Sequence, residues 1–344
     1  MTVKSVFLVK YGAASQAFEV RDSSTKPEPG PGQLRVAVEA FGLNYADVMA
    51  RKGLYQDAPP IPAVLGYEVV GRVEALGAGV DGPKPGTRVA ALTRFGGYAT
   101  HAITDARAVA AIPDDMDVGI AAAIPTQGAT AWFCAEEMVR LHAGDHVLVQ
   151  AAAGGVGTLL VQLAKRHGCV VYGTAGSEEK LDYLKKLGVD VPINYRTTDF
   201  AEVIERKRGD EGIDVVFDSL GGAAIRKGLK LVRAGGRVVA FGAAEHEAGS
   251  LQVLRSLKFL ASFGFPHPVL LMMASKSFLA VNMLRVADQR PLIVKRCLEN
   301  VIDLVLRGEL TPHVGGRFTV DRIADAHAFL ENRGSMGKIV VSWA

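Results

Sequence analysis

Cysteine is scarce and long apolar runs are absent in this chain of 344 residues. Its three cysteines, Cys134, Cys169 and Cys297, form no Cys-x-x-Cys pair, which argues against a disulfide framework and against a cysteine zinc site. No apolar run reaches the ~20 residues that a membrane-spanning helix needs. The first residues, MTVKSVFLVKYG, also lack the apolar segment and small-residue cleavage site of a signal peptide. We therefore expect a cytoplasmic protein with no integral membrane segment.

Blocks of charge are missing as well. The 39 Lys and Arg and the 36 Asp and Glu residues give a net charge of only +3 and are spread along the chain, so nucleic acid is not an expected partner. With 49% hydrophobic residues the chain is globular, and its length predicts two domains instead of one core.

Residues 1–126 are predicted to be rich in β-structure. Short apolar runs such as QLRVAVEAFGLN and VVGRVEALGAGV alternate with Gly and Pro, and PEPGPGQ is a turn cluster ahead of a strand. Many short strands joined by tight turns are typical of a small barrel or sandwich.

The pattern changes near residue 127, where strands and helices begin to alternate. Helices are predicted over 155–167 and from Ser177, the expected N-cap, to about Gly188. The predicted strands are HVLVQ, CVVYGTA, VPINY, GIDVVFDSL, GRVVAFGA and KFLASFGF. This alternation predicts an α/β domain over 127–266, with a parallel sheet covered on both faces. Residues 267–344 hold helices at 292–307 and 321–332 and strands ending in GRFTV and GKIVVSW, and are expected to complete the first domain.

A glycine-rich loop, AAAGGVG, lies between the predicted strand 146–150 and the predicted helix 155–167. It fits A-x-G-x-x-G at Ala152, Gly154 and Gly157, with alanine in place of the usual first glycine. In a strand–loop–helix context this pattern favours a dinucleotide, whose phosphates would meet the backbone at Gly154 and the N-terminus of the helix. A tight turn without a ligand is the plainer alternative.

The end of the next strand bears on which dinucleotide is bound. An NAD site normally carries an acid about 20 residues after the loop, and here Ala175 stands near that place, followed by Gly176 and Ser177. Lys180 supplies positive charge one turn into the helix, which favours the 2′-phosphate of NADPH. Glu178 and Glu179 have the opposite sign, unless they are first-turn charges that face solvent.

Three stretches carry a family resemblance: FGLNYADVMARKGLY, VLGYEVVGRVEALGAGV and AAAGGVG. With them the chain resembles the zinc-independent quinone oxidoreductase branch of the medium-chain dehydrogenase/reductase superfamily, and the tail ELTPHVGGRF is most similar to the vesicle amine transport protein 1-like subgroup. The resemblance covers essentially the whole chain. It implies a GroES-like β-barrel domain, a Rossmann doubly wound parallel-sheet domain that binds NADP, an active site between them, and a homodimer.

Relatives that oxidise alcohols hold a catalytic zinc with Cys, His and a further Cys. The resemblance places Asn44, Tyr67 and Thr126 at these positions, and none of them is a good zinc ligand. Glu68 survives from the same motif, but one carboxylate is not a metal site. We therefore expect no metal, and with it no metal-assisted alcohol oxidation.

Hydride delivery to an acceptor that is already electrophilic needs no metal, so NADPH-dependent reduction of quinones or activated α,β-unsaturated carbonyls is the expected activity. The resemblance implies that Asn44 and Tyr55 act there: Tyr55 as a proton donor, Asn44 as a hydrogen-bond partner of the substrate or cofactor. Tyr55 as a packing aromatic and Asn44 as a helix cap remain open alternatives. So does Lys338, as a cofactor contact or a solvated lysine.

The further cofactor contacts form a group carried over position by position from the family, in which each aromatic residue has a core role as its alternative. They are Thr130, Gly154, Gly155, Val156, Gly157, Ser177, Lys180, Tyr195, Phe241, Gly242, Ala243, Phe263 and Phe265.

Two other functions stay open at this point. A 2-enoyl thioester reductase shares the scaffold and the tyrosine, and a non-catalytic NADPH-binding sensor or interaction protein shares the cofactor site. The apolar, Met-rich segment 263–285 suits a cleft wall, a dimer interface or a membrane surface equally well.

Overall fold

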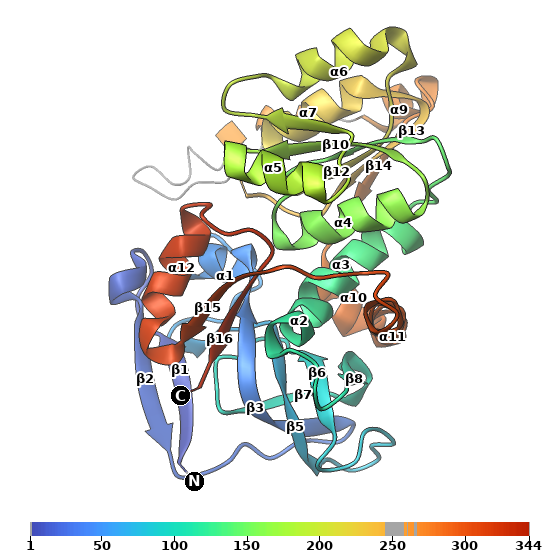
Figure 1. The fold of residues 1–344 in the computed structure, drawn as a ribbon. Coiled ribbons are helices and arrows are strands. Elements are labelled where there is room, and N and C mark those ends of the chain that lie inside the picture. Colours follow the sequence, from blue (N-terminus) through green and yellow to red (C-terminus); the bar gives the residue numbers. More distant parts are fainter. Residues whose placement is uncertain (1, 245–257, 260, 265–266, 344) are drawn as a thin grey trace. The chain divides into compact units, whose positions relative to one another are not determined.

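The computed structural model describes residues 2–244, 258–259, 261–264 and 267–343. The chain divides into two compact units (Figure 1). The first comprises Met1–Ala129 with Met283–Ala344, and the second comprises Thr130–Asn282. The second unit extends beyond the expected end at 266 because the strand β14 (Ser277–Ala280) pairs with its sheet.

A six-stranded parallel sheet forms the centre of the second unit. Its order is β11-β10-β9-β12-β13-β14, and every pairing is parallel. Taken in chain order this is 3-2-1-4-5-6, the doubly wound Rossmann order, as predicted. The remaining strands are β9 (His146–Val149), β10 (Val170–Ala175), β11 (Val191–Asn194), β12 (Ile213–Asp218) and β13 (Val232–Ala240).

Helices connect these strands and pack on the sheet. Helix α4 (Gly155–Arg166) buries Leu159, Leu160 and Leu163 on one face and contacts β9 and β10, which confirms the helix predicted over 155–167. Ser177 is the N-cap of α5, also as predicted. The other helices of this unit are α3 (Ala129–Trp132), which begins at the last residue of the first unit, α5 (Glu178–Lys186), α6 (Phe200–Arg208), α7 (Gly222–Leu231) and α9 (Pro268–Met273).

The prediction of a strand at KFLASFGF, residues 258–265, is wrong. Residues 258–259 and 261–262 are helical, and the sixth strand is β14 instead. Phe259 and Phe263 lie four residues apart, the spacing of one helical face, and their rings pack edge to face with centroids 5.1 Å apart. The apolar run is short enough to form either a strand or a helix, and the contact between these two rings agrees with the helix.

The first unit is built mainly on a mixed sheet in the order β15-β16-β3-β5-β6-β8, with β7 paired to β3. This order ends at β15 and β8, so the closed barrel that the resemblance implies stays a prediction. The strands are β3 (Gln33–Leu43), β5 (Glu68–Leu76), β6 (Arg88–Leu92), β7 (His101–Asp105), β8 (Val109–Ala111), β15 (Val314–Thr319) and β16 (Lys338–Ser342). A smaller sheet joins β2 (Phe18–Ser23), β1 (Val3–Leu8) and β4 (Ala63–Val64).

The C-terminal segment is part of this unit because β16 pairs antiparallel with β3. The core is apolar and includes Leu34, Leu65 and Val341, together with Phe41 stacked on Tyr98. The helices are α1 (Tyr45–Arg51), α2 (Val118–Ala123), α10 (Met283–Gln289), α11 (Pro291–Leu306) and α12 (Ile323–Glu331), and the last two confirm the helices predicted near 292–307 and 321–332. In the described part of the chain, none of the helices combines the length and apolar character needed to cross a membrane.

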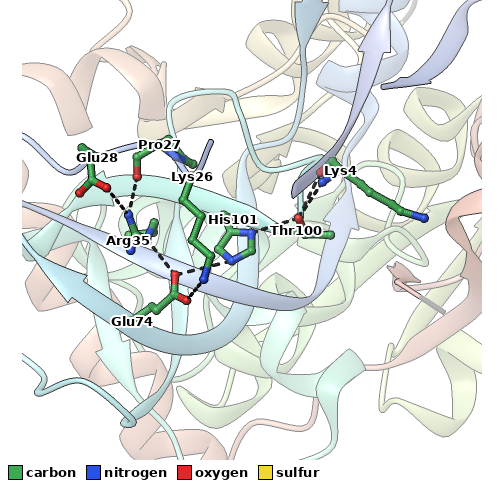
Figure 2. Close-up of polar contacts among 8 residues, drawn as sticks. All are labelled: Lys4, Lys26, Pro27, Glu28, Arg35, Glu74, Thr100 and His101. Atoms are coloured by element: carbon green, nitrogen blue, oxygen red, sulfur yellow. Dashed lines mark hydrogen bonds and ion pairs between the residues drawn. The ribbon is translucent and has the colours of Figure 1, made fainter. Parts of the chain in front are cut away.

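A cluster of charged side chains lies around Glu74, near the end of β5 (Figure 2). Arg35 donates from Nε to Glu74 at 2.8 Å, Lys26 pairs with the same carboxylate, and His101 Nε2 lies 3.6 Å from it. Thr100, next to His101, exchanges hydrogen bonds with the backbone of Lys4 on β1. The cluster therefore sits where the two sheets of this unit meet.

Candidate active site

The glycine loop connects β9 to α4 in the second unit. Gly154 is the N-cap of α4, and its N–H donates to Ala151 O at 2.8 Å. A Cβ at Gly157 would stand 2.4 Å from Ala151 O and 2.8 Å from Ala152 Cα, so only glycine permits this close approach of helix and loop. The first-turn N–H groups of α4, at Gly155, Val156 and Gly157, have no carbonyl partner within the helix and form an anion-binding end.

Two buried side chains that the sequence analysis did not identify hold this loop in place. Thr174 Oγ1 accepts from Ala151 N at 3.0 Å and donates to Gln150 Oε1 at 2.7 Å. Thr174 O also accepts from Ala152 N at 2.9 Å. The loop is thus fastened to β10 on both sides of the residue with positive φ, Ala151. A lone threonine in an apolar strand gave no signal for this role.

Several of the residues predicted to contact the cofactor lie around the turn after β10. Ala175 is buried at the end of the strand, and Ser177 Oγ accepts from Lys180 N at 3.4 Å. A Cβ on Gly176 would meet the Tyr195 hydroxyl at 2.5 Å, so that hydroxyl lies directly against the Gly176 backbone. The Ser177 hydroxyl, the Lys180 N–H and the Tyr195 hydroxyl therefore lie around one short turn.

The two acids that follow Ser177 are accessible to solvent. Glu178 and Glu179 are exposed, and Glu178 accepts from Asn194 Nδ2 at 3.0 Å. Their exposure agrees with first-turn charges that face solvent.

The loops after β12 and β13 are in close contact with each other. A Cβ on Gly242 would lie 2.6 Å from Ser219 O, and Gly221 stands against Ala243 and the ring of Phe263. Asp218 is buried and accepts from Gly221 N at 2.7 Å, which fixes the turn after β12. Phe241 follows β13 directly, Thr130 lies buried on α3, and Phe265 falls outside the described residues.

All four of these loops follow the carboxyl ends of parallel strands, the edge where ligands bind in such sheets. At Gly157 and Gly176 a Cβ would clash with neighbouring atoms, and Lys180 lies in the first turn of α5, which follows Ala175, where an acid is lacking. These residues fit a phosphate-bearing dinucleotide.

In the first unit, Asn44 follows β3 directly and is the N-cap of α1. Its backbone N–H donates to Asp47 Oδ2 at 2.8 Å, so the carboxylate of the first turn takes part in the cap. The Asn44 side chain is engaged elsewhere: Nδ2 lies 2.9 Å from each oxygen of Glu68, and Oδ1 accepts from Lys338 Nζ at 3.2 Å.

Glu68 and Lys338 form an ion pair with no exposed surface on either side chain. Glu68 begins β5, Lys338 begins β16, and both lie beside Gly42 on β3. A Cβ at Gly42 would stand 2.0 Å from Glu68 Oε1 and 2.2 Å from Lys338 Cε, so the pair occupies the space of the missing side chain. Lys338 is therefore not the solvated lysine considered above; its ammonium is held by Glu68 and Asn44.

Tyr55 lies half-buried, with its ring edge-on to Tyr67 at a centroid distance of 6.1 Å. Burial, reinforced by the negative charges of Asp57 and Asp47, raises the pKa of Tyr55 above its ordinary value. Tyr67 is buried and packs on Phe95, and burial raises its pKa as well. Both phenols thus keep their protons at neutral pH, the state that a proton donor requires.

Asp47 is fully buried, and its Oδ1 has no hydrogen-bond partner in the described part of the chain. Burial raises the pKa of Asp47 to about 7, helped by the negative charge of Glu68 and opposed by the hydrogen bond from Asn44. The protonated carboxyl is therefore favoured over a wider pH range than in solvent.

The three positions of the family's zinc ligands do not fit a metal here. Asn44 Oδ1, the amide atom that could bind a metal, accepts from Lys338 Nζ at 3.2 Å. Tyr67 lies against two aromatic rings, and Thr126 Oγ1 donates to Tyr67 O at 3.4 Å. Within the described ranges, no three His, Cys, Asp or Glu side chains gather as metal ligands would.

Sequence comparison places the chain among known proteins. Residues 30–114 match the alcohol dehydrogenase GroES-like domain, and residues 155–267 match the zinc-binding dehydrogenase family. The human synaptic vesicle membrane protein VAT-1 homolog is 34% identical over 92% of this chain and 80% of its own length. The chain belongs to the medium-chain dehydrogenase/reductase superfamily, in its quinone oxidoreductase branch with the VAT-1 homologues. Another relative in this superfamily, a 2-haloacrylate reductase of a Burkholderia species, is 33% identical, with 91% of each chain covered.

Solved structures of this superfamily share the whole fold. A quinone oxidoreductase of Pseudomonas syringae aligns with a TM-score of 0.84 at 27% identity, covering 99% of this chain and all of the other. A mycobacterial protein complexed with NADPH aligns with a TM-score of 0.83 at 28% identity, with 99% of each chain covered. The CurK enoyl reductase aligns with a TM-score of 0.83 at 26% identity, again over 99% of each chain.

Proposed function

We propose that this protein is an NADPH-dependent reductase that transfers hydride to quinones or activated α,β-unsaturated carbonyls without zinc. The observation that carries this proposal is the buried Asn44–Glu68–Lys338 cluster. By the family resemblance Asn44 stands at a position where alcohol-oxidising relatives hold their metal, and here its amide is bonded to the ion pair of Glu68 and Lys338 instead. This supports an acceptor that is already electrophilic, since such an acceptor needs no Lewis acid.

The residues of the first unit supply hydrogen bonds and a proton. NADPH, when bound, supplies the hydride. As negative charge develops on the acceptor oxygen, Asn44 stabilises it by hydrogen bonding, and Tyr55 delivers its phenolic proton. The raised pKa of Tyr55 keeps that proton in place until charge develops nearby.

Preference for NADPH over NADH is proposed from the turn after β10, where Ala175 replaces an acid and Lys180 adds a cation. The NADPH complex of the mycobacterial neighbour supports the same cofactor. Lys180→Ala is expected to weaken NADPH binding about tenfold, the loss of one charge-assisted contact, with little change for NADH. Fluorescence titration with both cofactors measures this, and Lys185→Ala, an exposed lysine of the same helix, is the matched control. Equal affinity of the wild type for both cofactors would contradict the proposal.

Two of the similar proteins are named for acceptors with activated double bonds, a 2-haloacrylate reductase and a quinone oxidoreductase, and this supports the proposed acceptor class. The enoyl reductase among the structural neighbours favours enoyl thioesters as a second candidate. NADPH consumption across quinones, short enones and enoyl thioesters, with and without a chelator, tests these classes together. Turnover confined to thioesters supports the second candidate. Tight NADPH binding without turnover of any acceptor supports a sensor or interaction protein.

A homodimer is proposed through the edge of the Rossmann sheet. Strand β14 ends the sheet order, and the neighbouring helix α9 exposes Val269, Leu270, Met272 and Met273. Exposed apolar side chains beside an open strand edge are typical of an interface. Analytical ultracentrifugation of the wild type and of a Met272→Lys/Met273→Lys variant tests this: the wild type should sediment as a dimer and the variant as a monomer.

A further inference from the structure

The amide of Asn44 lies between a carboxylate and an ammonium group. Glu68 can only accept hydrogen bonds and Lys338 can only donate them. The Nδ2 end must therefore face Glu68 and the Oδ1 end must face Lys338, as the distances of 2.9 Å and 3.2 Å record. Reversing the amide would set its oxygen against the carboxylate and its NH₂ against the ammonium. The ion pair thus admits one orientation of the amide and rejects the other.

This arrangement leaves one N–H of Asn44 available. Both oxygens of Glu68 lie 2.9 Å from the same nitrogen, and because they belong to one carboxylate they subtend a smaller angle there than the two N–H bonds of the amide. One N–H therefore serves the carboxylate and the other points elsewhere. Asn44 is not completely enclosed, with 8% of its surface exposed, in contrast to Glu68 and Lys338.

The ion pair that orients Asn44 is rigid, because neither of its charged side chains has room to move. Both are fully buried, Lys338 Nζ has a further contact with Leu43 O at 3.4 Å, and the pair fills the space above Gly42. A solvated pair would exchange partners with water and would not fix the amide. Burial makes this pair selective for one orientation.

We propose that Glu68 and Lys338 are positioning residues that fix the orientation of Asn44, so that its remaining N–H donates to the acceptor oxygen as hydride arrives. This inference rests on the proposed reductase function. Neither charged side chain contacts the acceptor, and their effect on the reaction passes through the amide of Asn44.

The decisive variant is Glu68→Gln/Lys338→Met, which removes both charges and nearly keeps the volume. Glutamine accepts either end of the Asn44 amide and methionine prefers neither, so the orientation is no longer selected. We expect kcat to fall about tenfold or more, part of the 10²–10³ that a lost oxyanion donor costs. The dissociation constant of NADPH and the melting temperature should change little, because replacing a buried pair by neutral groups is often close to neutral for stability.

A comparison in a second background separates positioning from a direct role. In Asn44→Ala, which lacks the amide, the same double substitution should leave kcat unchanged. An equal loss of kcat in the wild-type and Asn44→Ala backgrounds would overturn the inference. An unchanged kcat in the wild-type background would also overturn it. A shift in NADPH affinity alone would instead assign Lys338 to the cofactor and would also overturn it.

A readout without turnover keeps the two proposals apart. The side-chain NH₂ signals of Asn44 in a ¹⁵N NMR spectrum, assigned by their loss in Asn44→Ala, should form one sharp pair in the wild type and a broadened or doubled pair in the double variant. Identical signals in both would overturn the inference. If the wild type reduces no acceptor, the proposed function fails, while these signals still decide how Asn44 is held.

Discussion

Strand β5 carries two paired glutamates whose surroundings differ sharply. Glu68, at its start, is fully buried with Lys338 and Asn44. Glu74, near its end, has 28% of its side chain exposed and is shared by Lys26 and Arg35, with His101 beside it (Figure 2). Burial alone would raise the pKa of Glu74, but hydrogen bonds from Lys26 and Arg35 outweigh this effect and lower it.

The difference shows that pairing and burial act separately. Glu74 can lose one basic partner and keep another, with water taking the vacant place. Glu68 depends on a single cation, and no solvent reaches it. The contacts of Glu74 are therefore replaceable one by one, whereas the contact between Glu68 and Lys338 fixes the geometry of its surroundings.

The largest expected effect is that of Lys338→Met, which leaves Glu68 buried and unpaired. Breaking such a pair typically costs 3–5 kcal/mol, so the urea midpoint should fall by a correspondingly large amount. Adding Glu68→Gln to Lys338→Met should restore most of the lost stability. A single variant as stable as the wild type would show that the two glutamates are less different than their burial suggests.

Asp47→Asn extends the comparison to a carboxyl that is buried without a cation of its own. The folded pKa of Asp47, about 7, exceeds the ordinary value of about 4, so its protonated form stabilises the fold at low pH and this contribution is lost as pH rises between 4 and 7. Asparagine still accepts from Asn44 N–H but does not ionise. The free energy of unfolding of the variant, relative to the wild type, should therefore rise by up to about 1.4 kcal/mol per pH unit across that window. Urea titrations at pH 4 to 8 measure it, and a difference independent of pH would contradict it.

Gly42→Ala tests whether the buried pair tolerates displacement. The added methyl group would meet Glu68 Oε1 at 2.0 Å and Lys338 Cε at 2.2 Å, and overpacking of this kind costs about 1–3 kcal/mol. Gly82→Ala is the matched control, because the nearest atom to its Cβ is Val80 Cγ1 at 3.5 Å. Equal melting temperatures for the two variants would show that the pair can shift.

The smallest effect is expected at the exposed end of β5. Lys26→Met removes one of two cations from Glu74, and partly exposed pairs contribute about 0–1 kcal/mol. Stability should change within that range, and added salt should shrink the difference further. A loss of stability as large as that of Lys338→Met would show that Glu74 depends on its cation as strongly as Glu68 does.

Local patterns predicted most of the second unit. The strand–loop–helix around Gly154, the cap at Ser177 and the absence of an acid at Ala175 are all short-range features, and the structure places them as expected. The failure at 258–265 has a local cause too, since a brief apolar run does not distinguish strand from helix. The extent of the sheet depended on β14, which lies in a segment with no clear period.

The buried cluster of the first unit could be predicted only in part. Asn44 and Glu68 stood out through the family motif, but Lys338 lies 270 positions from Glu68, and no sequence period connects them. A lysine at the start of a strand is usually solvated, and here the pairing of β16 with β3 buries it. Topology, which single-sequence patterns record poorly, creates this site.

The buried ammonium of Lys338 also limits how the protein can be redesigned. Replacing Asn44 with cysteine to install zinc would bring a dication near an existing cation and make both compete for Glu68. Such a redesign would have to begin at residue 338, on a strand that contributes no ligand.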